Sequence, residues 1–315
     1  MNELDVVVSG LVFQDLVLGL PTPPRPGTEV WATDSHESPG GIANFAVALA
    51  RLGLRTGMAA TFGVDDLGAR LWDRLQAEHI DLSLSRKLGN WPTPLTVALA
   101  YDNDRALVTR GTTPPLSADD LISTPPRAKA VAAHIGPWPN EWLAKAKAAG
   151  SLVFADVGWD PSEHWDPAVL DQLEHVDVFL PNADEAMAYT RTTSPGAALE
   201  SLATKVPVVV VSNGAHGAEA IDGRTGERVA VPAFSVPAAD TTGAGDVFAA
   251  GFIAATLWDL PLAQRVRFAA LTAALSVTKL GGADAAPRWE DLAQWQREHP
   301  EDRHLEALIS AHSGR

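Results

Sequence analysis

Short valine-rich apolar runs alternate along the chain with alanine-rich runs that have helical spacing. Residues 6–8 and 208–211 are two of the apolar runs, and neither alternates polar with apolar positions. Uninterrupted runs of this kind are typical of strands that helices cover on both faces. Strands that alternate with helices indicate βαβ units. The pattern therefore predicts a three-layer α/β/α sandwich with a mostly parallel central sheet.

Two stretches, at about residues 11–35 and 91–110, break this alternation. Both combine prolines with strand-forming residues, and proline confines such segments to sheet edges or loops. In the second stretch, the sequence DND and then Arg105 separate two strand-like runs, as a hairpin turn does. We expect a small β lid built from the two insertions. An unpaired lid edge is also a natural pairing surface, so we expect a homodimer joined through it.

Composition is consistent with one globular domain. The chain has 315 residues, of which 46% are hydrophobic, and neither a repeat nor a low-complexity linker divides it. We predict a single domain over residues 1–315, with a peripheral helix after Pro287. The apolar runs are too short to span a membrane, and the N-terminus lacks the basic segment of a leader peptide.

The net charge and the cysteine content limit which binding partners and which chemistry we expect. The formal net charge is −15 and there is no cysteine. A strongly acidic chain is a poor ligand for phosphate backbones and anionic lipids, so we expect neither a nucleic-acid nor a membrane partner. Without cysteine, the chain can form no disulfide and no thiolate site, which is consistent with a cytoplasmic protein.

Residues 240–246 read DTTGAGD and stand directly before the apolar run VFAAGFIAA. Gly243 and Gly245 would let the backbone at a helix start approach an anion closely. Asp246, in the first helical turn, could accept a proton from a hydroxyl group. Loop and carboxylate together suit phosphoryl transfer. An ordinary helix cap is the plainer interpretation.

Other phosphate-binding motifs fit less well. The third glycine of a dinucleotide-binding GxGxxG motif is absent, because Phe248 occupies its place, and no Walker A sequence occurs in the chain. The protein-kinase motif set is also missing.

The stretch DTTGAGDVFAAGFI resembles the C-terminal signature of the ribokinase-like (PfkB-type) carbohydrate kinases. A second stretch, PGGIANFAVALARLG followed by TFGVDDLG, resembles the N-terminal signature of the same family. Ile42 departs from the small residue or proline that is usual at its position. The order and separation of the two stretches also match, and the resemblance runs over about residues 4–290. It implies a ribokinase-like fold and an ATP-dependent kinase.

The resemblance also implies roles for single residues. Asp246 would be the catalytic base, and the backbone around Gly243, Ala244 and Gly245 would form the anion hole. Asn182 and Glu185 resemble the family's Asn-x-x-Glu motif, which binds Mg²⁺ through water. By itself, this spacing equally describes a helix-capping arrangement.

Further positions match the nucleotide and cation sites of the family. Ser212, Gly214 and Gly217 would contact ATP. Asp240 and Thr242, together with the glycine pair at 281 and 282, resemble a site for a monovalent cation such as K⁺.

Acceptor contacts are implied at four positions: Asp15, Gly40, Gly41 and Asn44. The sequence ADVGWDPSEHW lacks the arginine that several sugar-acid kinases of the family carry in this region, which argues against a keto-deoxy sugar acid. We expect an ATP-dependent kinase that phosphorylates a hydroxyl of a small sugar. A nucleoside kinase of the same fold remains an alternative, and a non-catalytic sugar-binding regulatory protein is a weaker one.

Overall fold

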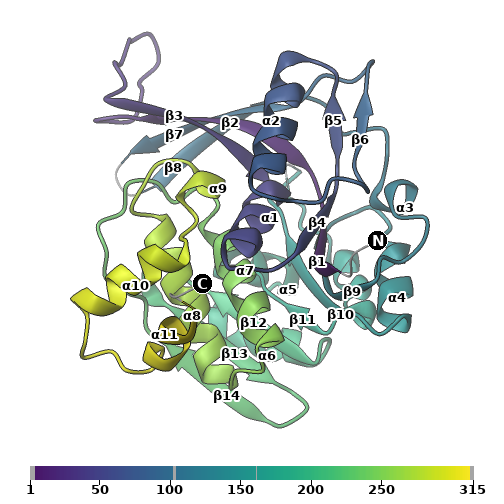
Figure 1. The fold of residues 1–315 in the computed structure, drawn as a ribbon, viewed down its shortest axis with the longest axis vertical. Helices are drawn as coiled ribbons and strands as arrows, with labels where there is room; N and C mark the ends of the chain where they lie inside the picture. Colours follow the sequence, from purple (N-terminus) through teal and green to yellow (C-terminus); the bar gives the residue numbers. More distant parts are fainter. Residues whose placement is uncertain (1–3, 102–103, 161, 313–315) are drawn as a thin grey trace.

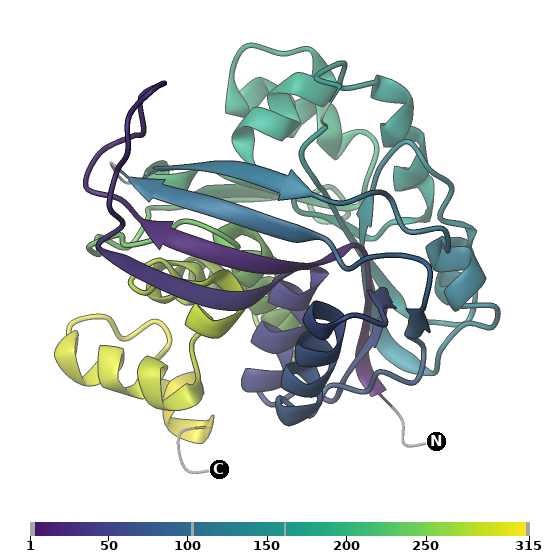
Figure 2. The same ribbon diagram turned by 90° about the horizontal axis from the view of Figure 1, so that it is seen from above.

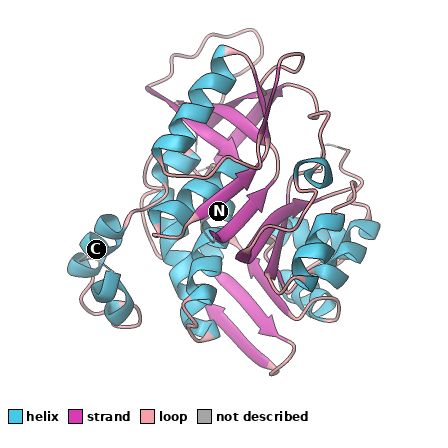
Figure 3. Ribbon diagram, turned by 45° about the vertical axis from the view of Figure 1, so that its right-hand side comes forward, coloured by secondary structure: helices cyan, strands magenta, loops and turns pink. Residues whose placement is uncertain are grey.

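A central eight-stranded sheet organises the protein, as Figures 1 and 3 show for the computed structural model, which describes residues 4–101, 104–160 and 162–312. The strand order is β14-β13-β12-β11-β10-β9-β1-β4, and within this sheet only the pairings of β13 are antiparallel. The prediction of a mostly parallel sheet is confirmed. The strands are β1 (Leu4–Ser9), β4 (Thr56–Ala59), β9 (Ala128–Ile135), β10 (Leu152–Val157), β11 (Val178–Phe179), β12 (Val208–Ser212), β13 (Ala218–Asp222) and β14 (Glu227–Val231).

Successive valines of one strand pack against opposite helical layers, which explains why the apolar runs do not alternate. Val6 and Val8 lie in one buried cluster and Val7 in the other. The first layer consists of α1 (Ile42–Arg51), α2 (Asp66–Ala77), α7 (Ala244–Leu257) and α8 (Leu262–Ser276). The second consists of α3 (Ala118–Leu121), α4 (Glu141–Ala148), the 3₁₀ helix η1 (Pro167–His175), α5 (Ala183–Thr190) and α6 (Pro195–Ala203).

The chain changes direction across the sheet at β1. From β1 it first builds β4 on one side, then crosses to β9 on the other side, and the later strands extend away from β9. The connections that follow β1 and β9 therefore lead to opposite sides of the sheet, and they diverge at the carboxyl ends of these two strands. Ligands of open parallel sheets bind at such a point, and the candidate site lies there.

A second sheet of four strands in the order β3-β2-β7-β8 confirms the predicted β lid (Figure 2). Within the insertion at about residues 11–35, residues 20–33 form the connection between two lid strands, and the second strand runs on into the glycine pair at 40 and 41. The predicted turn at 102–103 lies outside the described residues. Arg105 lies within a strand, opposite Ala100. The strands are β2 (Val12–Gly19), β3 (Asp34–Gly41), β7 (Leu95–Tyr101) and β8 (Asp104–Arg110).

The C-terminal part forms peripheral helices, as predicted. Trp295 and Ile309 are buried in a separate apolar cluster against Phe268 of α8, and Figure 1 shows these helices at one side of the molecule. In the described parts of the chain, no helix is long and apolar enough to cross a membrane. The remaining elements are β5 (Thr61–Gly63), β6 (Arg86–Leu88), the 3₁₀ helix η2 (Gly214–His216), α9 (Gly282–Ala285), α10 (Trp289–Glu298) and α11 (Glu306–His312).

Candidate active site

Helix α7 begins without a side-chain cap. Its N-cap residue is Gly243, which has a left-handed backbone conformation (φ 72°) that favours glycine. A Cβ at Gly245 would meet no atom within 4 Å. Within the described residues, no acceptor binds the backbone N–H groups of Gly245 and Asp246. The positive end of α7 thus presents free N–H groups to open space, which suits an anion.

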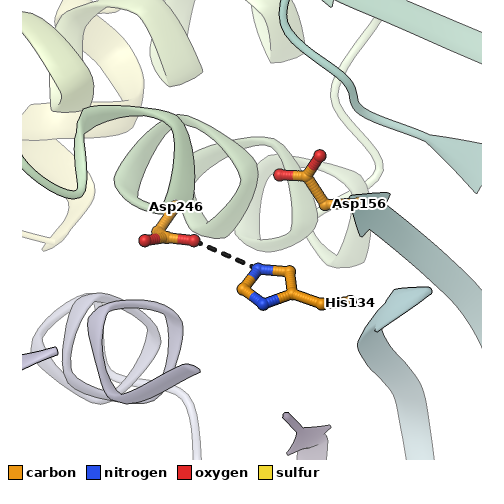
Figure 4. A group of neighbouring side chains, drawn as sticks. All are labelled: His134, Asp156 and Asp246. Carbon is orange, nitrogen blue, oxygen red and sulfur yellow. Dashed lines mark hydrogen bonds and ion pairs between the residues drawn. The ribbon is translucent and has the colours of Figure 1, made fainter. Parts of the chain in front are cut away.

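The carboxylate of Asp246 is held from two sides and does not cap its own helix. Asn44 donates a hydrogen bond from Nδ2 to Oδ2 over 2.7 Å. His134 Nε2 lies 3.2 Å from the other oxygen, Oδ1 (Figure 4). The side chains of His134 and Asp246 remain 17% and 18% exposed, so the carboxylate is held in place and still accessible.

The glycine pair before α1 brings Asn44 to this point. Gly41 has a φ of 63°, and a Cβ there would collide with the backbone of Leu11. Only glycine therefore allows the chain to turn from β3 directly into α1. The Asn44 side chain contacts Asp246 through its amide nitrogen, while its buried Oδ1 has no partner among the described residues. That oxygen faces the glycine pair at 281 and 282, since a Cβ at Gly282 would lie 2.8 Å from it.

Strand β2 of the lid brings Asp15 into the same region. Its side chain packs against Gly40, where any Cβ would collide with the carboxylate. Asp15 is only 4% exposed. Burial, with the nearby negative charges of Asp246 and Asp240, raises the pKa of Asp15 to about 7. The structure thus brings together Asp15, Gly40, Asn44 and Asp246, and their role in binding an acceptor stays a prediction.

The first aspartate of the motif, Asp240, connects two loops. Its Oδ1 accepts a hydrogen bond from the Thr242 backbone and its Oδ2 accepts one from the Gly281 backbone, both over 2.9 Å. The buried hydroxyl of Thr242 has no partner among the described residues. Arg105 of β8 donates to the Thr241 hydroxyl over 2.9 Å, so the lid contacts the loop that leads into α7.

At the start of α5, Asn182 and Glu185 form a reciprocal capping box. The Glu185 backbone donates to Asn182 Oδ1 over 2.9 Å, and the Asn182 backbone donates to Glu185 Oε2 over 3.0 Å. The capping alternative is therefore present in the structure. Burial raises the pKa of Glu185 to about 7, and the negative charge of Asp246 adds to this effect. A half-buried acidic group near a second carboxylate is favourable for a cation.

The three predicted nucleotide contacts after β12 lie in different surroundings. Ser212 ends the strand and pairs with Asn182 through a parallel bridge. Gly214 has open space around it, whereas a Cβ at Gly217 would collide with the backbone of Val231 in β14. The need for glycine at Gly217 is thus explained by the close approach of two strands.

Two residues of the site, His134 and Asp156, are absent from the sequence prediction. They are direct neighbours in the β9–β10 register, near the carboxyl ends of both strands. Together with Asp246 they place one ligand atom each within 4.8 Å of one another (Figure 4). Burial raises the pKa of Asp156 well above its usual range, and the charges of Glu185 and Asp246 add to this. The available signal was one polar side chain near the end of each apolar strand, in AKAVAAHI and LVFADV.

Comparison with known proteins identifies the family. The family model described as pfkB family carbohydrate kinase matches residues 4–289. The chain belongs to this family. The two signature stretches had predicted nearly the same span, and that prediction is confirmed.

Relatives of this pfkB-family protein include sugar and sugar-phosphate kinases. Ribokinase from Haemophilus influenzae is 26% identical over 318 residues, covering 92% of this chain and 97% of that protein. An ATP-dependent ribose-1-phosphate kinase from Halopiger xanaduensis is 28% identical over 299 residues, covering 93% of this chain and 98% of that protein.

Solved structures confirm the ribokinase-like fold. Arabidopsis thaliana ribokinase, complexed with ribose and ATP, superposes with a TM-score of 0.76 at 23% identity, covering 93% of this chain and 98% of that chain. Adenosine kinase from Sinorhizobium meliloti superposes with a TM-score of 0.75 at 22% identity, covering 89% and 95%. A ribokinase and an adenosine kinase thus share this fold.

In this pfkB-family protein, the residues at the starts of α7 and α5 have the chemistry to bind a nucleotide together with Mg²⁺. Free N–H groups at the start of α7 suit a phosphoryl group. The carboxyls of Asp156 and Glu185 have raised pKa values because they are buried near other negative charge, so a dication would favour their ionised forms. Magnesium prefers oxygen ligands and retains water, which matches the carboxylate and amide oxygens at the start of α5.

Proposed function

We propose that this protein transfers the γ-phosphoryl group of MgATP to a hydroxyl of a small sugar. The observation that carries the proposal is the start of α7, where the Asp246 carboxylate stands beside unpaired backbone N–H groups. The acceptor oxygen bonds to phosphorus, its proton passes to Asp246, and the bond from phosphorus to the leaving ADP oxygen breaks. The N–H groups around Gly243, Ala244 and Gly245 stabilise the negative charge of the transferring group.

We assign acceptor binding to the region between the lid and α1. The carboxyl of Asp15 and the side-chain amide of Asn44 would supply hydrogen-bonding groups, and the backbone of Gly40 and Gly41 would border the acceptor. The lid sheet would exclude water, which otherwise competes as the nucleophile.

We assign the nucleotide to the neighbouring strand ends. Asn182 and Glu185 would hold Mg²⁺ through water, and Ser212, Gly214 and Gly217 would border the nucleotide. The metal supplies positive charge to the phosphates. The orphaned Thr242 hydroxyl near Asp240 supports a monovalent cation such as K⁺ beside the anion hole.

The lid also supports a homodimer. Strand β8 is an edge of the second sheet, and its Leu107 and Val108 are exposed. Pairing of two lid sheets would cover these side chains and provide hydrogen-bond partners for the backbone at the β8 edge. The lack of cysteine supports a cytoplasmic location for the enzyme.

A nucleoside kinase is the second candidate, supported by the structural similarity to adenosine kinase. It would use the same phosphoryl-transfer residues with a different acceptor. ADP release by the purified protein with Mg²⁺, K⁺ and ATP, measured over panels of neutral sugars and nucleosides, separates the two. If no acceptor is phosphorylated but a sugar still binds, the regulatory alternative replaces both.

A further inference from the structure

His134 is the one imidazole that the described residues place against the carboxylate of Asp246. It is the penultimate residue of β9, beside the point where the chain crosses over at β1. The ring of Phe45 in α1 packs edge-on against it, with 5.3 Å between centroids. Strand and aromatic neighbour together hold the ring in one orientation.

The proposed role of Asp246 assigns the proton on the ring. A carboxylate that acts as a base is ionised and only accepts hydrogen bonds, so in this role His134 Nε2 is the donor to Asp246 Oδ1. Asn44 Nδ2 donates to the other oxygen. Each oxygen of Asp246 therefore binds one N–H group, and rotation of the carboxylate breaks at least one of these bonds. A proton acceptor held in this way keeps its alignment with a bound hydroxyl.

The hydrogen bond from His134 to Asp246 matters because most ionisable side chains near Asp246 are acidic. Asp15 approaches from β2, Asp156 from β10 and Glu185 from α5. Only Asn44 and His134 donate side-chain hydrogen bonds to it among the described residues. Without His134, repulsion by these acids would favour side-chain orientations that turn Asp246 away from them.

We propose that His134 is a positioning residue for phosphoryl transfer, which acts by donating from Nε2 to Asp246 Oδ1 and so aligns this carboxylate with the acceptor hydroxyl. The role rests on the proposed kinase function. His134 does not take the acceptor's proton, which passes to Asp246.

A paired substitution tests this role. Replacing His134 by leucine removes the donor, and we expect kcat to fall about 100-fold while KM for ATP and for the acceptor stays near the wild-type value. Glutamine can place an N–H group near the position of Nε2, so His134→Gln should recover most of kcat. If both variants lose the same activity, or if His134→Leu raises only the acceptor KM, the positioning role is wrong.

Two measurements do not depend on turnover and separate this inference from the proposed function. Imidazole ¹⁵N NMR of the wild-type protein should show protonated Nε2 for His134, with a signal that changes in Asp246→Ala. A ring protonated only on Nδ1 would overturn the inference even in an active enzyme. The competing possibility is that His134, Asp156 and Asp246 bind a metal ion. Calorimetry with Mn²⁺ or Zn²⁺ alone tests it. Metal binding that is lost in His134→Leu would overturn the positioning role.

Discussion

The starts of α7 and α5 both lie near the carboxyl ends of strands of the central sheet. The sequence predicts that each binds part of MgATP. Helix α5 begins with a capping box, in which Asn182 and Glu185 each bind the other's backbone. Helix α7 has a glycine at its N-cap and no side-chain cap. The capping box occupies the backbone N–H groups of Asn182 and Glu185, and the Glu185 carboxyl remains available to a cation, whereas the uncapped start of α7 leaves N–H groups for an anion. We therefore propose that capping distinguishes the phosphoryl site at the start of α7 from the metal site at the start of α5.

The largest effect should come from removing the carboxylate at the α7 start. We expect Asp246→Asn to lower kcat by about 10³- to 10⁴-fold, because the acceptor proton loses its base. Thermal stability and sugar binding, measured by calorimetry, should stay close to wild type. A near-normal rate would contradict the proposed mechanism.

Asp15 tests the acidic surroundings of the α7 start. Because its pKa is raised to about 7 in the folded protein, the native state binds more protons than the unfolded state between about pH 4 and 7, and stability falls as pH rises through that window. Asp15→Asn should remove a destabilisation of at most about 4 kcal/mol above pH 7. Denaturation from pH 5 to 8 measures it, and a pH-independent difference from wild type would refute the assignment.

Gly245 probes the open space at the uncapped helix. Alanine meets no protein atom there and favours the helix by about 0.5–1 kcal/mol, so Gly245→Ala should be at least as stable as wild type. Its Cβ would enter the space assigned to the phosphoryl group, and we expect kcat to fall about 10- to 100-fold. An equally active variant would show that no anion binds there. Gly243→Ala is the contrasting variant, since its Cβ would lie 2.8 Å from Asn44 Nδ2, and it should lose stability as well as activity.

The capped helix gives the smallest effects. Asn182→Ala should destabilise the protein by about 1 kcal/mol through loss of the cap, as urea denaturation would measure. Glu185→Gln keeps an oxygen that can accept the backbone hydrogen bond but loses the charge, so stability should hold while more Mg²⁺ is needed for half-maximal rate. An unchanged Mg²⁺ requirement would leave Glu185 with a capping role alone.

Much of the site could be predicted because its residues stand in short contiguous motifs. DTTGAGD contains the proposed base, the glycines of the proposed anion hole and Asp240 within seven consecutive positions. His134 and Asp156 belong to no such motif and look like single polar residues in apolar strands. Arg105 was expected in a turn, but β-pairing with Ala100 places it in a strand.

The sequence by itself determined the sandwich, the lid segments and the helix that begins at the glycine loop, since each depends on local periodicity or on adjacent residues. Only the tertiary structure decided which side chains meet. The β9–β10 register places His134 beside Asp156, the crossover at β1 brings β9 next to α7, and Gly40 leaves room for Asp15. These contacts join residues far apart in the chain, so packing of the whole sheet, and no local pattern, sets the distances around Asp246.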